Sequence, residues 1–127
     1  MRSSSPNRTR PKPSSTTARG RAAERRVAWH YRLRGYRILA RNARAGGIEL
    51  DLVVRRGRRL VFVEVKLKRG QSYGDPVEAV DRWKQARLRR GIDAWLAAHP
   101  ADAELDVGFE IAAVQPGGIE RVPDLLY

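Results

Sequence analysis

The sequence predicts a small α/β domain in which helices flank a mixed β-sheet. One helical pattern is followed by three strand-like runs, a second helical pattern and two more strand-like runs. The chain has 127 residues, which is long enough for one hydrophobic core but not for two. A long helix between two groups of strands acts as a crossover, so the next strand should run parallel to one of the first three.

The first element is expected to be a helix over residues 21–34, ending at Gly35, since glycine commonly caps helices. The twenty residues before it contain five basic residues, no acidic residue and almost no apolar side chain. Such a segment buries too little apolar surface to offset the entropy that is lost on folding. We therefore expect residues 1–20 to form a disordered basic arm and residues 21–127 to form the domain.

Three strands are expected next, over residues 36–41, 48–55 and 60–66. Aliphatic side chains alternate along the second and third of these runs, which is typical of half-buried strands. The short segment between them contains Gly57, so we predict an antiparallel hairpin with an even-numbered loop, because only that register aligns the two aliphatic faces. The predicted faces are Ile48, Leu50, Leu52 and Val54 in one strand, and Val61, Val63 and Val65 in the other.

The same register gathers acidic side chains. Asp51 should lie directly or diagonally opposite Glu64, with Glu49 and Lys66 nearby. Like charges in this position destabilise a sheet and raise each other's pKa, and a cation such as Mg²⁺ would offset them, since it commonly binds one or two carboxylates. Asp51 and Glu64 are therefore candidate metal ligands. Lys66 is a candidate to neutralise phosphate charge, or to orient or deprotonate a water molecule.

An ordinary solvated surface is the open alternative for these residues. Glu64 and Lys66 would then form an exposed pair, and Asp51 would be unrelated to them. A D…ExK spacing often arises by chance, so the spacing alone does not decide between the two interpretations.

The second helix is expected to run from Asp75 to about Ala98, because Asp75 is a typical N-cap residue and Pro76 suits the first helical position. Two strands, over residues 104–115 and 119–122, complete the order. The three tryptophans fall on the predicted helices, where we expect them in the core or at a dimer surface: Trp29, Trp83 and Trp95.

The charge of the chain favours a polyanionic partner. The formal net charge is +12, and residues 21–90 hold twenty Lys or Arg against seven acids. Acids within a basic field suit a site that cleaves phosphodiesters, although the arginine content can also reflect genome base composition. Candidate nucleic-acid contacts are Arg69, Tyr73 and Lys84. The stem of Lys84 would alternatively cover apolar surface on its helix.

The cellular location is expected to be the cytoplasm, without a membrane anchor. The chain has no cysteine, which excludes disulfides and thiolate metal sites and fits a reducing compartment. No apolar run approaches membrane-spanning length, and the basic arm lacks the apolar centre of a secretory signal.

Five motifs extend over almost all of the chain after the arm. They are Gly20-Arg21-x-x-Glu24-x-x-x-Ala28, Gly35-Tyr36-x-Ile38-Leu39-x-Arg41-Asn42, Glu49-x-Asp51-Leu52, Val61-Phe62-Val63-Glu64-Val65-Lys66, and Gly74-x-Pro76-x-Glu78-Ala79-Val80 with Lys84. Together they resemble the YraN-like family of small bacterial endonuclease-like proteins. That family is similar in its core to the PD-(D/E)xK nuclease superfamily, which includes archaeal Holliday junction resolvases and restriction enzymes. The resemblance implies a restriction-endonuclease-like three-layer core.

The resemblance also implies roles for four residues. Asp51 and Glu64 match the metal-ligand positions of the superfamily, and Lys66 matches its lysine. Glu24 matches the helix glutamate that can complete the metal site, although the helix dipole alone would stabilise an acid there. Ala23 is a mild departure, because the family usually has glycine at this position.

The function implied is a Mg²⁺- or Mn²⁺-dependent endonuclease acting on DNA rather than RNA. Branched or structured DNA as substrate, and a homodimer, are expected by analogy alone. Two alternatives stay open. One is a nucleic-acid-binding module of the same fold without catalysis, and the other is an adaptor whose basic face binds an acidic protein.

Overall fold

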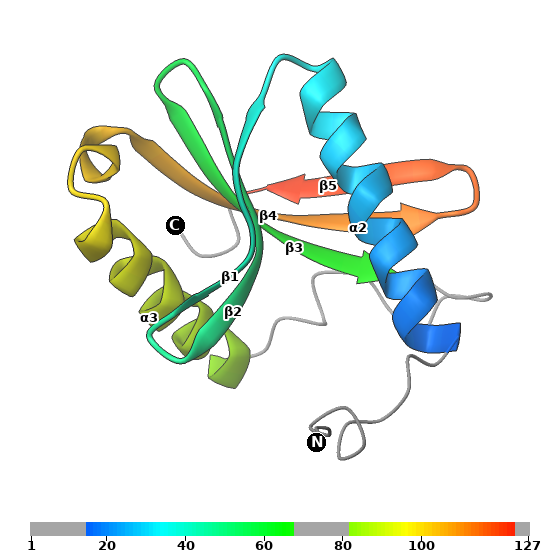
Figure 1. Cartoon of the computed structure of the whole chain (residues 1–127), viewed down its shortest axis with the longest axis horizontal. Helices are drawn as coiled ribbons and strands as arrows, with labels where there is room; N and C mark the ends of the chain where they lie inside the picture. The colour runs from blue at the N-terminus through cyan, green and yellow to red at the C-terminus, as the bar shows by residue number, and fades with distance from the viewer. Residues whose placement is uncertain (1–14, 68–81, 124–127) are drawn as a thin grey trace, which may run out of the picture.

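The structure is a computed structural model that describes residues 15–67 and 82–123. A five-stranded sheet has helices on both faces (Figure 1). The elements are α2 Ser15–Leu33, β1 Arg37–Ala45, β2 Ile48–Arg56, β3 Arg59–Leu67, α3 Arg82–Ala98, the 3₁₀ turn η2 Asp102–Glu104, β4 Asp106–Gln115 and β5 Gly118–Pro123.

The strand order is β1-β2-β3-β4-β5, and the sheet is mixed. Neighbouring strands are antiparallel except β3 and β4, which are parallel and are connected through α3. Residues of α2 pack on one face of the sheet and residues of α3 on the other. The predicted three-layer α/β core, with a helix as the crossover to a parallel strand, is confirmed.

The first helix is longer than predicted. α2 begins at Ser15, six residues before the predicted start at Arg21, so the last part of the expected arm is helical. Once Ala23 and Val27 anchor the helix to the sheet, each residue added at its N-terminus gains one backbone hydrogen bond without the cost of a new helix nucleus. Residues 1–14 and the predicted helix start at Asp75 lie outside the described residues.

The hairpin between β2 and β3 has the predicted even-numbered loop. Arg56 pairs with Arg59, leaving a two-residue connection in which Gly57 has φ 61°. Leu52 pairs with Val63 and Val54 with Val61, so these four aliphatic side chains all lie in the core against α2.

The predicted aliphatic face of β2 is wrong in its first half. Leu50 packs with the α3 cluster, whereas Leu52 packs with the α2 cluster. On the neighbouring strand β1, the register with β2 shifts between Ile38 and Ala40, and Asn42 has φ 50°. Irregularities of this kind bend a strand, so the closed end of the β1–β2 hairpin turns towards α3 and changes the environment of its side chains (Figure 1).

Glu110 of β4 is almost fully buried, with 2% of its surface exposed. One carboxylate oxygen accepts hydrogen bonds from the Tyr31 hydroxyl at 2.6 Å and from Arg121 Nε at 2.9 Å. The other accepts from a second Arg121 nitrogen at 3.1 Å and from Arg59 at 3.2 Å. Burial opposes the charged form, but these donors outweigh it and hold the pKa of Glu110 below its usual value. The network joins α2 to three strands.

Of the two positions predicted for the tryptophans, Trp95 takes the core position, since it is buried beside Phe62. Trp29 is 58% exposed and Trp83 is 76% exposed, so neither lies in the core, and the alternative of a dimer surface stays a prediction for both. Helical spacing alone does not fix which side of a helix meets the sheet. Neither described helix has the length and apolar character that crossing a membrane requires.

Two helical glycines give a matched test of the packing. At Gly91 an added Cβ would lie 3.0 Å from Ile48 Cβ, whereas at Gly20 it would meet nothing within 4 Å. We expect Gly91→Ala to lower the free energy of unfolding by about 1–3 kcal/mol through overpacking. Gly20→Ala should raise it by about 0.5–1 kcal/mol, because alanine favours helix. Urea denaturation measures both. A Gly91→Ala protein as stable as the wild type would contradict the close approach of β2 to α3.

Candidate metal and phosphodiester site

The two candidate ligands lie on the adjacent strands β2 and β3. The paired residues Leu52 and Val63 are the last in the register at this end, and Asp51 and Glu64 come directly after that pair on their strands. Beyond this pair the Asp51 side chain takes the place of a backbone partner, because the Val65 N–H donates a hydrogen bond to Asp51 Oδ2 at 2.9 Å. The Asp51 carboxylate therefore lies in the opening between the two strands.

A pocket of about 230 Å³ opens beside these carboxylates. The lining residues come from β2, β3 and α3 and are Ile48, Glu49, Asp51, Glu64, Lys84, Arg87 and Leu88. Leu60, Phe62 and Glu64 are every second residue of β3 and therefore share one face of the strand. Leu60 and Phe62 pack on α3, so the Glu64 carboxylate lies on the α3 face of the sheet. Burial of the aliphatic and aromatic side chains thus directs Glu64 towards the helix.

Lys84 contacts Glu64 directly. Its Nζ lies 2.9 Å from Glu64 Oε2, with 32% of the Lys84 side chain and 14% of the Glu64 side chain exposed. The sequence had assigned Lys84 either to phosphate or to the cover of apolar surface. Its place in the pocket follows from the packing of α3, and its role towards nucleic acid stays a prediction.

The electrostatics of Asp51 show that negative charge is crowded here. Burial and, after it, the neighbouring charge of Glu64 together raise the pKa of Asp51 to about 7, while the hydrogen bond from Val65 acts in the opposite direction. Glu24 and Glu49 add smaller contributions of the same sign as Glu64. A site that disfavours its own ionised carboxylate is one that a bound cation would stabilise.

Lys66 shares the electrostatic environment of Glu64 and Asp51. Burial lowers the pKa of Lys66, the nearby Lys84 lowers it further, and the two carboxylates act in the opposite direction. A lysine with a lowered pKa is suited to proton transfer as well as to phosphate binding.

Glu24 is not drawn into contact with the other two acids. It lies on α2, which covers the opposite face of the sheet from α3, and its Oε1 is 3.5 Å from Asn42 Nδ2. Within residues 15–67 and 82–123, no three histidine or acidic side chains are arranged to hold a metal ion. The structure thus brings Asp51, Glu64 and Lys66 into one electrostatic environment, which the charge of Glu24 reaches from α2. The predicted contacts Arg69 and Tyr73 fall outside the described residues.

The donor set nevertheless fits a magnesium ion. Mg²⁺ usually binds through one or two carboxylates and keeps several water molecules. Asp51 and Glu64 supply hard oxygen donors from adjacent strands, beside a pocket with room for water. The raised pKa of Asp51 is the independent sign that positive charge is favourable at this point.

Sequence reasoning missed two residues of this region. Arg87 lies one helical turn after Lys84, and this spacing was a usable signal for a shared face. Asn42 is bracketed by the paired residues Arg41 and Ala43, which places it opposite Asp51 on the neighbouring strand. Asparagine is enriched in left-handed conformations, which was a weaker signal for an irregular strand.

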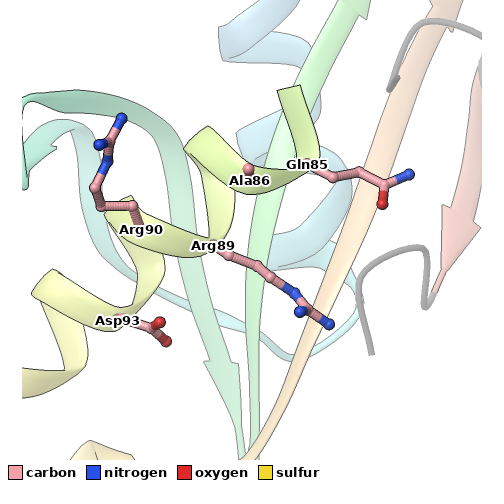
Figure 2. Close-up of a pocket in the computed structure, with 5 residues that line it drawn as sticks. All are labelled: Gln85, Ala86, Arg89, Arg90 and Asp93. Atoms are coloured by element: carbon pink, nitrogen blue, oxygen red, sulfur yellow. The ribbon is translucent and has the colours of Figure 1, made fainter. Parts of the chain in front are cut away.

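A second pocket, of about 550 Å³, lies along α3 and contains none of the predicted site residues. Its lining is Gln85, Ala86, Arg89, Arg90 and Asp93. Gln85 and Arg89 project to one side of the helix, whereas Arg90 projects to the other (Figure 2). This surface carries two arginines and one carboxylate on the helix that also supplies Lys84 to the candidate site.

Comparison with known proteins gives consistent matches of one kind. The family model described as "Uncharacterised protein family UPF0102" matches residues 23–114. A UPF0102 protein of Nitrobacter winogradskyi is 41% identical over 102 residues, covering 80% of this chain and 85% of the relative. A UPF0102 protein of Symbiobacterium thermophilum is 43% identical over 98 residues, covering 77% and 82% respectively.

Among solved structures, the structure of Pyrococcus furiosus SfsA in complex with Ca²⁺ aligns with a TM-score of 0.37 and 17% identity. The alignment covers 85% of this chain and 62% of SfsA, so the chain spans less than two thirds of that protein.

The crowding of charge at Asp51 predicts a pH-dependent stability. The folded state raises the pKa of Asp51 from 3.8 to about 7, so between these values it binds a proton that the unfolded state does not. The free energy of unfolding should therefore fall as the pH rises from about 4 to about 7. Asp51→Asn removes this loss and keeps an oxygen that can accept the Val65 hydrogen bond. We expect the variant to be more stable than the wild type by about 1–2 kcal/mol at pH 8, after allowance for solvent screening.

Urea denaturation in the presence of a chelator, at pH 4.5 and pH 8, measures this difference. Asp106→Asn is the matched control, because the Asp106 side chain is 72% exposed and lies at the other end of the β3–β4 ladder. An Asp51→Asn protein less stable than the wild type at pH 8 would show that the carboxylate is not electrostatically strained.

Proposed function

The chain belongs to the uncharacterised protein family UPF0102, and we propose that it is a Mg²⁺- or Mn²⁺-dependent endonuclease that hydrolyses DNA phosphodiester bonds. The single observation that carries the proposal is that two carboxylates from adjacent strands, Asp51 and Glu64, line one pocket together with Lys84. This arrangement provides hard oxygen donors within a chain of net charge +12.

In the proposed reaction, Asp51 and Glu64 hold the metal ion. When bound, the ion would polarise a phosphoryl oxygen and lower the pKa of a water molecule. The Val65 N–H fixes the Asp51 carboxylate, so this ligand is oriented in advance by the backbone of β3. Lys66 is assigned to the substrate phosphate, where its positive charge would stabilise the charge that develops in the transition state.

Glu24 has a weaker claim than the other acids. Its charge reaches Asp51, since it contributes to the raised pKa, but its carboxylate lies towards Asn42. We propose that it acts on the metal site through water rather than as a direct ligand.

The substrate is proposed to be DNA because of the basic field around the site and the resemblance to the nuclease superfamily. Branched or structured DNA, a homodimer and a cytoplasmic location belong to the same proposal and rest on that resemblance and on the composition. Arg69, Tyr73 and Lys84 remain candidates for contact with the nucleic acid.

A second candidate function is a nucleic-acid-binding module that does not cleave. It is favoured by one observation, namely that Glu64 is engaged by Lys84 and that the described acids do not form a three-ligand group. Binding would then depend on basic residues and on salt, but not on Asp51.

A cleavage assay separates the two functions. Labelled duplex, single-stranded and four-way-junction DNA should be incubated with Mg²⁺, Mn²⁺ or a chelator. We expect metal-dependent cutting by the wild type and a loss of about 100-fold or more in Asp51→Asn and in Glu64→Gln, because each removes a charged ligand. DNA binding in chelator should be retained by both variants.

Asp106→Asn, which changes a carboxylate remote from the pocket, should cleave like the wild type. Metal-independent binding without cutting, equal in wild type and variants, would support the binding module. Cleavage that survives Asp51→Asn combined with Glu64→Gln would show that the assigned site is wrong.

A further inference from the structure

The contact between Lys84 and Glu64 places a cation on a proposed metal ligand. Lys84 Nζ lies 2.9 Å from Glu64 Oε2, which is the distance of a charge-assisted hydrogen bond. Lys84 comes from α3 and Glu64 from β3, so the ion pair also joins the crossover helix to the sheet.

The surroundings of this pair hold charges of both signs at close quarters. Asp51, Glu49 and Glu64 line the same pocket as Lys84 and Arg87. Lys66 is close enough to Lys84 for the two ammonium groups to repel each other. The positive charge of Lys84 therefore stabilises the Glu64 carboxylate, but the same charge destabilises the charged form of Lys66.

We propose that Lys84 and the divalent cation compete for Glu64, so that binding of the cation displaces Lys84 from this carboxylate. The inference rests on the proposed function, because it takes Asp51 and Glu64 as metal ligands. The Lys84 ammonium occupies a lone pair of Glu64 Oε2, and a cation bound to the same carboxylate would lie close to it, where two positive charges repel each other strongly in a partly buried site.

The exchange is sterically simple. The Lys84 side chain is about one third exposed, and its four-carbon stem rotates about several bonds. The ammonium group can therefore move into solvent while the stem stays packed against α3. α3 itself need not move. The barrier to metal binding is then the rupture of one ion pair rather than a change of fold.

The consequence is a metal threshold within the chain. The apparent affinity for the cation is the intrinsic affinity reduced by the fraction of molecules in which Lys84 has left Glu64. At low cation concentration the site remains neutralised by Lys84, and Glu64 becomes a ligand only when the concentration is sufficient.

Metal binding, rather than cleavage, is the direct test. Mn²⁺ titration by calorimetry should compare the wild type with Lys84→Met, which keeps the stem and removes the charge. We expect Lys84→Met to bind Mn²⁺ about tenfold more tightly, since a charge-assisted hydrogen bond no longer has to be broken. Its Tm in chelator should be lower than that of the wild type, because Glu64 is left unpaired, and added Mn²⁺ should remove the difference.

Arg87→Met is the matched control, because it removes the same charge from the same pocket and helix turn region. Direct competition predicts a change of less than about threefold for this variant, since it acts only through the general field. Equal affinities of Lys84→Met and the wild type, or equal gains in Lys84→Met and Arg87→Met, would overturn the inference and leave the proposed metal site intact.

Absence of Mn²⁺ binding in the folded wild type and in both variants would instead overturn the metal site and the inference together.

A second measurement follows the Lys84 side chain in the wild-type protein. With lysine ¹³C-labelled at Cε, the Lys84 resonance, assigned from Lys84→Arg, should shift as Mg²⁺ is added. A resonance that stays unchanged while Mg²⁺ binds would show that Lys84 does not compete.

Discussion

The antiparallel register of β2 and β3 is the constraint on which the candidate site depends. It pairs Leu52 with Val63 and Val54 with Val61, and all four side chains are buried. Burial of each such side chain stabilises the fold by about 1.5–3 kcal/mol, so the register as a whole outweighs the few kcal/mol that crowding costs at Asp51. A shift of one residue would place Glu64 in the apolar layer under α2. Asp51 and Glu64 come close together because burial of the aliphatic side chains fixes the pairing of the two strands.

Two buried carboxylates of the sheet, Glu110 and Asp51, lie in opposite electrostatic environments. On the α2 face, Glu110 is surrounded by donors from Tyr31, Arg59 and Arg121, and its pKa is lowered. Beside α3, Asp51 has one backbone donor and acidic neighbours, and its pKa is raised. The first arrangement is satisfied within the protein, which is typical of a structural role. The second is not, which is typical of a site that acts on something else.

Local patterns were sufficient to predict the parts of the structure that depend on local geometry. Alternation and the even-numbered loop predicted the hairpin and the proximity of Asp51 to Glu64, because pairing across a short turn involves few alternatives. They did not predict the contact of Lys84 with Glu64, since it depends on how α3 packs across the sheet. They also placed Leu50 on the wrong side, because β1 is irregular, with a register shift between Ile38 and Ala40 and a left-handed Asn42. Burial of Glu110 was not foreseen, since alternation assigns a face but does not say what covers it.

The parallel pairing of β3 with β4 has a consequence for the order of folding. β1, β2 and β3 pair with their sequence neighbours, and so do β4 and β5, whereas Arg59 meets Asp106 only after the whole of α3 has been placed. Closing this long loop loses chain entropy before the ladder returns any stabilisation, so it is expected to be the slow step. During synthesis, the N-terminal meander therefore emerges with one edge of β3 unpaired. Until β4 leaves the ribosome, that edge is expected to offer unpaired backbone groups to other chains, which favours aggregation.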